Sequence, residues 1–238
     1  MNDVFAPFKW EALFARGDEL AQAFLNTVLI SLLALLIALA LGFLFGMMSY
    51  AKHRAPRAIN RVYVEIVQNI PLLLQVFVLY AVLPLFGVMI GTFMIGVMGI
   101  GIYHGAYISE VVHSGLSSVQ KGQFEAARSQ GFTYWETMRH IILPQSIKTM
   151  MPALAVQAAN LIKNTSVLAL IAGGELMYFS NSFAYGTSYY GPAYVVAGVL
   201  YFLLCFPLSR LAKRLEERRK KEIKPGEEDI TCQNYLRG

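Results

Sequence analysis

Residues 20–51 read LAQAFLNTVLISLLALLIALALGFLFGMMSYA and contain no Asp, Glu, Lys or Arg. A helix needs roughly 20 apolar residues to cross about 30 Å of hydrocarbon, so this stretch predicts a membrane-spanning helix over about residues 24–50. The composition of the whole chain agrees, because 56% of its residues are hydrophobic and 15% are charged. Soluble domains contain about a quarter charged residues, so most of the surface is expected to face lipid.

Four further spans are predicted. Residues 66–109 carry no formal charge over a length that fits two helices, with a break near residues 84–87. Spans four and five are predicted over about residues 149–172 and 192–209, with Pro192 in the first turn of the last helix, where its missing N–H costs nothing. The acidic N-terminal segment differs from the basic start of a cleavable signal peptide. The sequence therefore predicts an all-α integral membrane protein with five transmembrane helices.

The distribution of basic residues predicts the orientation. Of the 20 Lys and Arg residues, all except Lys9, Arg16 and Lys163 lie between spans one and two, between spans three and four, or after span five. With five spans these three segments share one side of the membrane. By the positive-inside rule that side is the cytoplasm. We therefore expect the N-terminus outside and the C-terminus inside, with span five continuing as a solvated helix.

The segment between spans three and four is a polar island, GQFEAARSQG at residues 122–131. Residues 125–128 are good helix formers, and Gly131 permits a tight turn. Thr133 and Glu136 have the spacing of a capping box. They predict a second short helix to about residue 141, which Pro144 ends or redirects. The pattern predicts a cytoplasmic helix–turn–helix with a mixed, exposed surface suited to docking.

This segment resembles the cytoplasmic signature of the permease subunits of bacterial ABC importers. That signature is Glu-Ala-Ala, three residues, Gly, nine residues, a hydrophobic residue, one residue and Leu-Pro. The resemblance implies that a loop over about residues 117–148 is the coupling loop, which docks in a groove of a separate ATP-hydrolysing subunit. The residues expected to make this contact are Gly122, Glu125, Ala126, Ala127, Gly131, Leu143 and Pro144.

The resemblance covers about residues 20–210 and is strongest to the polar amino-acid branch, with glutamate/aspartate permeases most similar. The matching motifs are NTV at 26–28, YVE at 63–65, NIPLLLQ at 69–75, YISE at 107–110, LIKNTSV at 161–167 and GEL at 174–176. It implies a multi-pass permease of the bacterial cytoplasmic (inner) membrane that imports glutamate, aspartate or glutamine, with arginine and histidine as alternatives. The implied partners are a cytoplasmic ABC ATPase dimer, a second homologous or identical permease, and an extracytoplasmic substrate-binding protein.

Lys163 is the one basic residue inside a predicted span. Charges within a membrane are costly and indicate function, and on a helix Asn160, Lys163 and Asn164 share a face. That face is a candidate lining of the substrate path, where the ammonium would meet a substrate carboxylate. In the alternative interpretation, Lys163 pairs with Glu110 or Glu65, or reaches a membrane boundary. The candidate path residues are Lys163, Asn160, Asn164, Ser166, Glu110 and Gln75.

Two further features concern the helices themselves. Pro71 removes a hydrogen bond within span two, so a kink is expected there, at a gate or as a purely structural feature. Five glycines over residues 91–105 predict close helix packing of span three, within the chain or against a second permease. The chain accordingly divides into residues 1–19 outside the membrane, a permease domain over residues 20–210, and a cytoplasmic tail over residues 211–238.

Several activities are not expected. The chain has no Gly-x-x-x-x-Gly-Lys-Ser/Thr phosphate loop, so ATP and Mg should bind in the partner ATPase, and the chain should be no enzyme and need no cofactor. Cys205 and Cys232 predict neither a disulfide nor a metal site, and the four histidines lack zinc spacing. The net charge of +5 reflects topology and contact with anionic lipid rather than nucleic-acid binding.

Two other functional classes compete with the importer. One is a secondary transporter driven by an ion gradient, although the internal repeats often seen in that class are not apparent. The other is a non-transporting membrane scaffold that recruits a cytosolic partner.

Overall fold

The computed structural model describes residues 4–51 and 53–223, and every regular element within them is a helix. In chain order these are α1 (Pro7–Phe14), α2 (Gly17–Ser49), α3 (Arg54–Asn69), α4 (Leu72–Val82), η1 (Leu83–Phe86), α5 (Thr92–Ser117), α6 (Lys121–Ser129), α7 (Tyr134–Thr137), η2 (Met138–Ile142), α8 (Leu143–Asn164), η3 (Thr165–Ile171), α9 (Leu176–Thr187) and α10 (Tyr190–Ile223). Cys232 and the tail from residue 224 lie outside the described residues.

Helices suited to crossing a membrane form the body of the molecule. Within residues 4–51 and 53–223, 4 helical stretches are long and apolar enough, namely Gly17–Ser49, Thr92–Ser117, Tyr134–Ile171 and Tyr190–Arg219. A fifth crossing results if α3 and the helix Leu72–Phe86 are counted as one span, although the two are bent by 97°. The predicted all-helical membrane fold is therefore confirmed, with four to five spans by length and composition.

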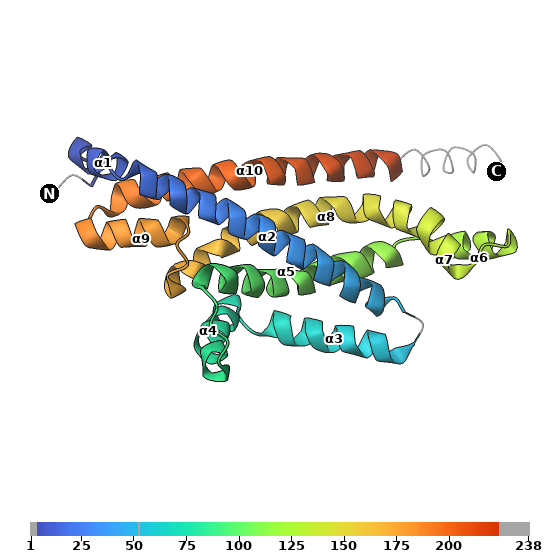
Figure 1. Ribbon diagram of the computed structural model, residues 1–238. Coiled ribbons are helices and arrows are strands. Elements are labelled where there is room, and N and C mark those ends of the chain that lie inside the picture. The colour runs from blue at the N-terminus through green and yellow to red at the C-terminus, as the bar shows by residue number, and fades with distance from the viewer. Residues whose placement is uncertain (1–3, 52, 224–238) are drawn as a thin grey trace.

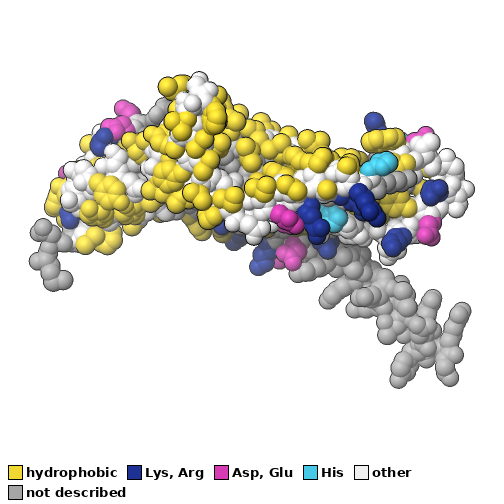
Figure 2. Space-filling model, turned by 90° about the horizontal axis from the view of Figure 1, so that it is seen from below, with side chains coloured by type: hydrophobic (Ala, Val, Ile, Leu, Met, Phe, Trp, Pro, Cys, Tyr) yellow, Lys and Arg dark blue, Asp and Glu magenta, His cyan; other side chains and the backbone are white. Residues whose placement is uncertain are grey.

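The helix ends fall into two groups at opposite ends of the molecule (Figure 1). At one end lie α6, α7, the start of α3 and the C-terminal end of α10. At the other end lie α1 and α9. The basic segments at the start of α3, around α6 and α7, and toward the end of α10 therefore share one end, as the charge distribution predicts. Hydrophobic side chains dominate the middle of the face in Figure 2, and many of the visible charged side chains gather toward the α6–α7 end.

The core forms where α2 and α5 pack together along their lengths. The two helices approach closely because glycines of α5 lie opposite aliphatic side chains of α2. A Cβ at Gly101 would lie 2.8 Å from Ile37 Cγ2, and a Cβ at Gly105 would lie 3.0 Å from Leu41 Cβ. The close packing predicted for span three is thus confirmed, and its partners at these two glycines belong to the same chain.

The second span differs from its prediction. It was expected to begin near residue 66 and to carry a kink, but α3 already begins at Arg54 and the chain turns by 97° beyond Asn69. Pro71 precedes α4 as its N-cap residue and lacks the N–H that a continuous helix needs. The Gln75 amide nitrogen donates to the carbonyls of Val67 at 2.7 Å and Ile70 at 2.8 Å. The freed carbonyls at the end of α3 are therefore satisfied from α4.

Distant motifs meet at the α1–α9 end. Asn26 Nδ2 donates to the Gly174 carbonyl at 2.9 Å, and the Leu176 amide donates to Thr27 Oγ1 at 3.0 Å. The buried Glu175 carboxylate caps α9 and accepts a hydrogen bond of 2.8 Å from the Tyr201 hydroxyl. These contacts join α2, α9 and α10, so the NTV and GEL motifs form one structural joint.

Candidate functional site

A polar cavity of about 280 Å³ lies between α5 and α8. Three of the lining residues on α8 were predicted to line a substrate path, namely Asn160, Lys163 and Asn164. Lys163 and Asn164 occupy the last turn of α8, where the α-helix gives way to the 3₁₀ segment η3. A 3₁₀ stretch within a helix often marks a functional hinge. The other lining residues are Tyr103, His104, Tyr107 and Gln157.

His104 organises the wall of this cavity. The imidazole is buried, with 2% of the residue exposed. Its Nε2 lies 3.0 Å from Asn164 Nδ2, and its Nδ1 lies 3.2 Å from Gln157 Oε1. Because the amide nitrogen donates and the amide oxygen accepts, a neutral imidazole with its hydrogen on Nδ1 satisfies both contacts. His104 thereby links α5 to two positions on α8 and orients two amides of the cavity.

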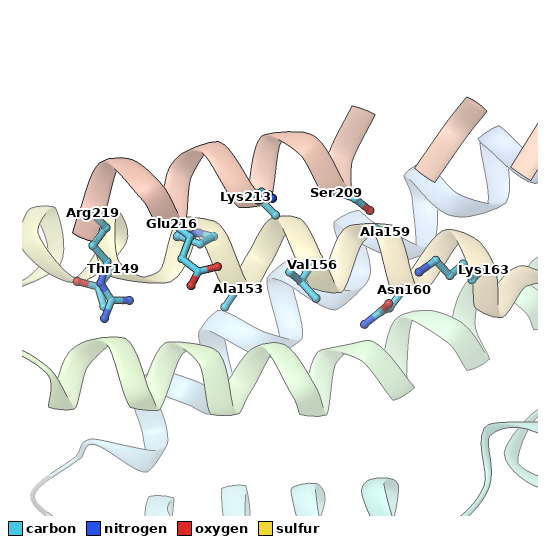
Figure 3. A pocket seen from close by; sticks show the side chains of 12 residues that line it. Thr149, Ala153, Val156, Ala159, Asn160, Lys163, Ser209, Lys213, Glu216 and Arg219 are labelled. Carbon is cyan, nitrogen blue, oxygen red and sulfur yellow. The ribbon is translucent and has the colours of Figure 1, made fainter. Parts of the chain in front are cut away.

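A second cavity, of about 460 Å³, lies between α8 and α10. Figure 3 shows Asn160 and Lys163 at one end of its lining, with Lys213, Glu216 and Arg219 of α10 toward the other. Asn160 and Lys163 line both cavities. The two spaces therefore adjoin at these residues and form a polar track that extends toward the α6–α7 end of the bundle.

The structure shows neither predicted pairing of Lys163 with a carboxylate. The Lys163 side chain is exposed, and the ion pairs within the described residues do not include it. Glu65 lies 3.2 Å from Arg61, one helical turn earlier in α3. Glu110 accepts a hydrogen bond of 2.8 Å from Gln68 Nε2. The ammonium thus remains available at the junction of the two cavities.

The other predicted path residues lie elsewhere. Gln75 caps α3, Glu110 contacts Gln68, and the Ser166 hydroxyl donates to the Lys163 carbonyl at 2.7 Å. None of these three lines either polar cavity. His104 and Gln157 were not among the predicted path residues, although each carries a signal in the sequence. His104 is an ionisable residue within a span, the criterion that identified Lys163, and Gln157 precedes Asn160 by three residues on the same helical face.

The predicted coupling segment forms a helical hairpin. Helix α6 ends at Ser129 and is followed by Gln130 and by Gly131, whose φ of +85° is in the left-handed region. The Phe132 amide donates to the Ala127 carbonyl at 3.0 Å, and the Gly131 amide donates to the Arg128 carbonyl at 3.0 Å. These two bonds form a Schellman motif, which glycine favours because it has no Cβ. The predicted turn at Gly131 is confirmed.

The second helix of the hairpin starts with the predicted capping box. Thr133 Oγ1 accepts from the Glu136 amide at 3.3 Å, and Glu136 Oε2 accepts from the Thr133 amide at 2.8 Å. A groove of about 580 Å³ lies between α6 and α7, with Lys121, Glu125 and Arg128 among its lining residues. Gly122, Glu125 and Ala126 are exposed, whereas Ala127 is buried within the hairpin. The exposed part of α6 is therefore accessible to a partner.

Pro144 does not end the helix, so the first of the two predicted outcomes is wrong. Residues Tyr134–Ile171 form one long helical stretch in which the π-helical segment η2 precedes α8. Pro144 lies in the first turn of α8, directly after the π segment. The wider turn changes the hydrogen-bonding pattern just where proline lacks an N–H. Leu143 packs against the core while Pro144 is exposed, so the second half of the signature joins the hairpin to α8.

No group of three or more His, Cys, Asp or Glu side chains in the described part of the chain could hold a metal ion.

Comparisons with known proteins agree with this arrangement. The profile of the family described as binding-protein-dependent transport system inner membrane component matches residues 38–221. The probable glutamine ABC transporter permease protein GlnM of Bacillus subtilis (strain 168) is 39% identical over 209 residues, which cover 88% of this chain and 97% of that protein. The probable glutamine permease protein GlnP of the same organism is 34% identical and covers 83% of this chain and 92% of its own length.

Solved structures show the same fold. The chain superposes with a TM-score of 0.80 and 27% identity on a crystal structure of an amino acid ABC transporter with histidines, covering 88% of this chain and 98% of that chain. It also superposes with a TM-score of 0.63 and 17% identity on the MetNI methionine ABC transporter in an inward-facing conformation, covering 86% and 98%. The second similarity concerns the fold alone.

Proposed function

Because the chain belongs to the family of binding-protein-dependent transport system inner membrane components, we propose that it forms the path of an ATP-driven importer of polar amino acids, together with a second permease. The chain is a permease subunit of the amino-acid ABC transporter type and a multi-pass protein of the bacterial inner membrane. The energy comes from a separate cytoplasmic ABC ATPase dimer that binds ATP and Mg. An extracytoplasmic binding protein delivers the substrate.

The polar cavity between α5 and α8 carries the proposal for the substrate. Its side chains offer amides at Gln157, Asn160 and Asn164 and an ammonium at Lys163, and such groups complement a carboxylate or a carboxamide. We infer that the substrate is glutamine or an acidic amino acid. The two probable permeases of Bacillus subtilis that resemble the chain are named for glutamine, which supports the same class.

The orientation follows from charge. The end of the bundle that carries α6, α7 and the C-terminal end of α10 is cytoplasmic, because the basic segments lie there. The N-terminal helix α1 and the helix α9 then face outward, toward the binding protein. In this orientation the polar track leads from the middle of the bundle toward the cytoplasm.

Coupling to the ATPase is assigned to the α6–α7 hairpin. Its exposed groove, with Lys121, Glu125 and Arg128, receives the partner, and the continuous helix from Tyr134 to Ile171 carries the motion inward. Lys163 and Asn164 lie on that helix near its far end. If the hairpin shifts and α8 moves with it as a rigid body, the positions of Lys163 and Asn164 in the cavity change as well.

Reconstitution tests the proposal. The chain is purified with its candidate ATPase, second permease and binding protein, and uptake of labelled glutamine, glutamate and arginine into liposomes is measured with and without ATP. We expect ATP-dependent uptake of glutamine or glutamate. Uptake that survives without ATP and follows an ion gradient would instead identify a secondary transporter, and a complex that assembles but never transports would identify a scaffold.

A double variant tests coupling within the same assay. Replacing Glu125 by Gln and Gly131 by Val removes an exposed carboxylate from the groove and strains the left-handed turn, and we expect uptake and substrate-stimulated ATP hydrolysis to be lost. Membrane insertion, measured by yield and monodispersity, should be retained. Normal uptake in the double variant would refute the coupling assignment. Gly198→Val serves as a control, since a Cβ at Gly198 meets nothing within 4 Å.

A further inference from the structure

A second, apolar groove adjoins the groove between α6 and α7 and lies where α2, α3 and α7 meet. It has a volume of about 580 Å³ and is lined mainly by aliphatic, methionine and aromatic side chains. Met47 and Met48 come from α2, Pro56 from α3 and Trp135 from α7. Methionine side chains adapt to flexible apolar ligands, so the lining suits a hydrocarbon chain.

The groove lies at the level where the apolar part of α2 ends. Ala51 lines it and is followed in the sequence by Lys52, His53 and Arg54. Trp135, with 73% of its surface exposed, lies at the same level, and tryptophan is enriched where hydrocarbon meets head groups. The groove therefore lies at a membrane interface rather than in the middle of the bilayer.

The first turns of α3 place positive charge beside the groove. His53 and Pro56 line it, and Arg54 and Arg57 directly follow them in the sequence, one helical turn apart and exposed. The ion pairs within the described residues include neither of these two arginines, whereas Arg61, one turn later, pairs with Glu65. Two exposed arginines thus directly follow groove-lining residues in the sequence, and neither forms an ion pair with a carboxylate among the described residues.

The groove is also open toward lipid. Leu44, which lines it, is 56% exposed, and Ile59 on the neighbouring turn of α3 is 54% exposed. The apolar surface therefore continues from the groove onto helices whose outer sides face the bilayer. A lipid can enter along this surface without leaving the membrane.

We propose that the groove between α2, α3 and α7 binds an anionic phospholipid, with an acyl chain in the groove and the phosphate at Arg54 and Arg57. Burial of apolar chain surface and charge-assisted hydrogen bonds from guanidinium to phosphate supply the affinity. The assignment of this lipid to the cytoplasmic leaflet rests on the proposed function; binding itself does not. The lipid also touches the coupling hairpin, because Tyr50 and Tyr134 line both this groove and the groove between α6 and α7.

Tryptophan quenching tests the proposal directly. The chain has two tryptophans, Trp10 and Trp135, so Trp10→Phe leaves Trp135 as the single reporter. This full-length variant is reconstituted into vesicles of phosphatidylcholine that contain increasing amounts of either brominated phosphatidylglycerol or brominated phosphatidylcholine. We expect brominated phosphatidylglycerol to quench Trp135 at a several-fold lower mole fraction.

Charge variants in the same background identify the headgroup site. Arg54→Gln with Arg57→Gln should remove the preference, since each basic residue near an anionic surface contributes roughly fivefold in affinity. Arg214→Gln with Arg218→Gln in α10 is the charge-matched control and should retain it. Ala51→Phe, which places a ring in the groove, should weaken quenching by phosphatidylglycerol without altering the arginines.

Equal quenching by the two lipids would overturn the proposal. So would a preference that survives in the Arg54 and Arg57 variant, or one that the Arg214 and Arg218 control loses to the same extent, since either result would mean non-specific attraction. If neither lipid quenches Trp135 and addition of the ATPase shields Trp135 instead, the groove is a protein contact, and lipid binding is refuted. Because quenching needs neither ATP nor substrate, its failure is distinguishable from failure of transport.

Discussion

Helix α5 contacts α2 along one side and α8 along another, and the two interfaces are built differently. Against α2, Gly101 and Gly105 allow the backbones to approach so closely that a Cβ would overlap the neighbouring side chains. Against α8, His104 meets the amides of Gln157 and Asn164, and a cavity of about 280 Å³ remains. One helix thus joins a dry, close-packed interface to a polar, hollow one.

The difference suggests that the α2–α5 interface stabilises the fold and that the α5–α8 interface serves transport. A close-packed interface resists displacement, because each shift costs van der Waals contacts. A polar interface with a cavity can exchange its hydrogen bonds for bonds to a substrate. We therefore expect substitutions on the α2 side to affect folding, and substitutions on the α8 side to affect transport.

Gly101→Val should have the largest effect on stability. Overpacking costs about 1–3 kcal/mol or more in a well-packed core, and here the new Cβ would also lie 3.2 Å from the Ala34 carbonyl oxygen, which belongs to the backbone. Thermal unfolding in detergent should show a lower Tm, by roughly 2–4 °C for each kcal/mol lost. An unchanged Tm would mean that the α2–α5 interface is looser than its geometry indicates.

His104→Leu should have a smaller effect on stability and a large effect on uptake. It leaves the Gln157 and Asn164 amides without their partner. An unsatisfied polar group costs about 1–3 kcal/mol when fully buried, and the cost is at the low end here because both amides line the cavity, where water can replace the imidazole. Uptake at low substrate concentration should fall roughly tenfold, which corresponds to about 1.4 kcal/mol. His104→Gln is the control, because its amide can restore one of the two bonds. Loss of stability with normal uptake would assign His104 a purely structural role.

Lys163→Glu should alter uptake with little effect on stability. The side chain is exposed and belongs to no ion pair within the described residues, so its replacement should change the free energy of unfolding by no more than about 0.5 kcal/mol. If the ammonium meets a substrate carboxylate, uptake of glutamate should fall more than uptake of glutamine in a competition assay. Lys163→Met separates loss of charge from reversal of charge. Unchanged selectivity in both variants would remove Lys163 from the path.

Tyr107→Phe should have the smallest effect. It removes the hydroxyl that lies 3.0 Å from the Tyr103 hydroxyl at the edge of the cavity, and a hydrogen bond of this kind contributes about 1 kcal/mol or less when partly solvated. The Tm should stay close to that of the parent, and uptake should change by less than the effect of His104→Leu. A larger loss of uptake than in His104→Leu would move the substrate contact from His104 to the tyrosine pair.

Much of the architecture was predictable from residue type alone. The stretch over residues 20–51 predicts α2 because it lacks charge over the length of a span. The positions of lysine and arginine predict which connections share one end of the bundle. Gly131 and Thr133 predict the turn and the start of α7, because a left-handed residue and a capping box are local features.

The details of the second and fourth spans were not predictable in this way. A proline indicates that a helix is disturbed, but the outcome depends on which groups replace the missing hydrogen bond. At Pro71 the Gln75 amide satisfies the end of α3, and the chain turns by 97°. At Pro144 a π-helical segment precedes the proline, and the helix continues.

The sequence by itself determined that this chain crosses a membrane several times, which of its segments share one end, and that a helical hairpin lies at that end. These properties depend on hydropathy, charge and local backbone geometry, which act over a few residues. Only the tertiary structure decided which polar groups meet. It placed His104 of α5 against Gln157 and Asn164 of α8, gave Glu65 and Glu110 partners other than Lys163, and formed the groove between α2, α3 and α7. Such contacts depend on how helices far apart in the sequence rotate and pack, because each helical face finds its partner only in the folded bundle.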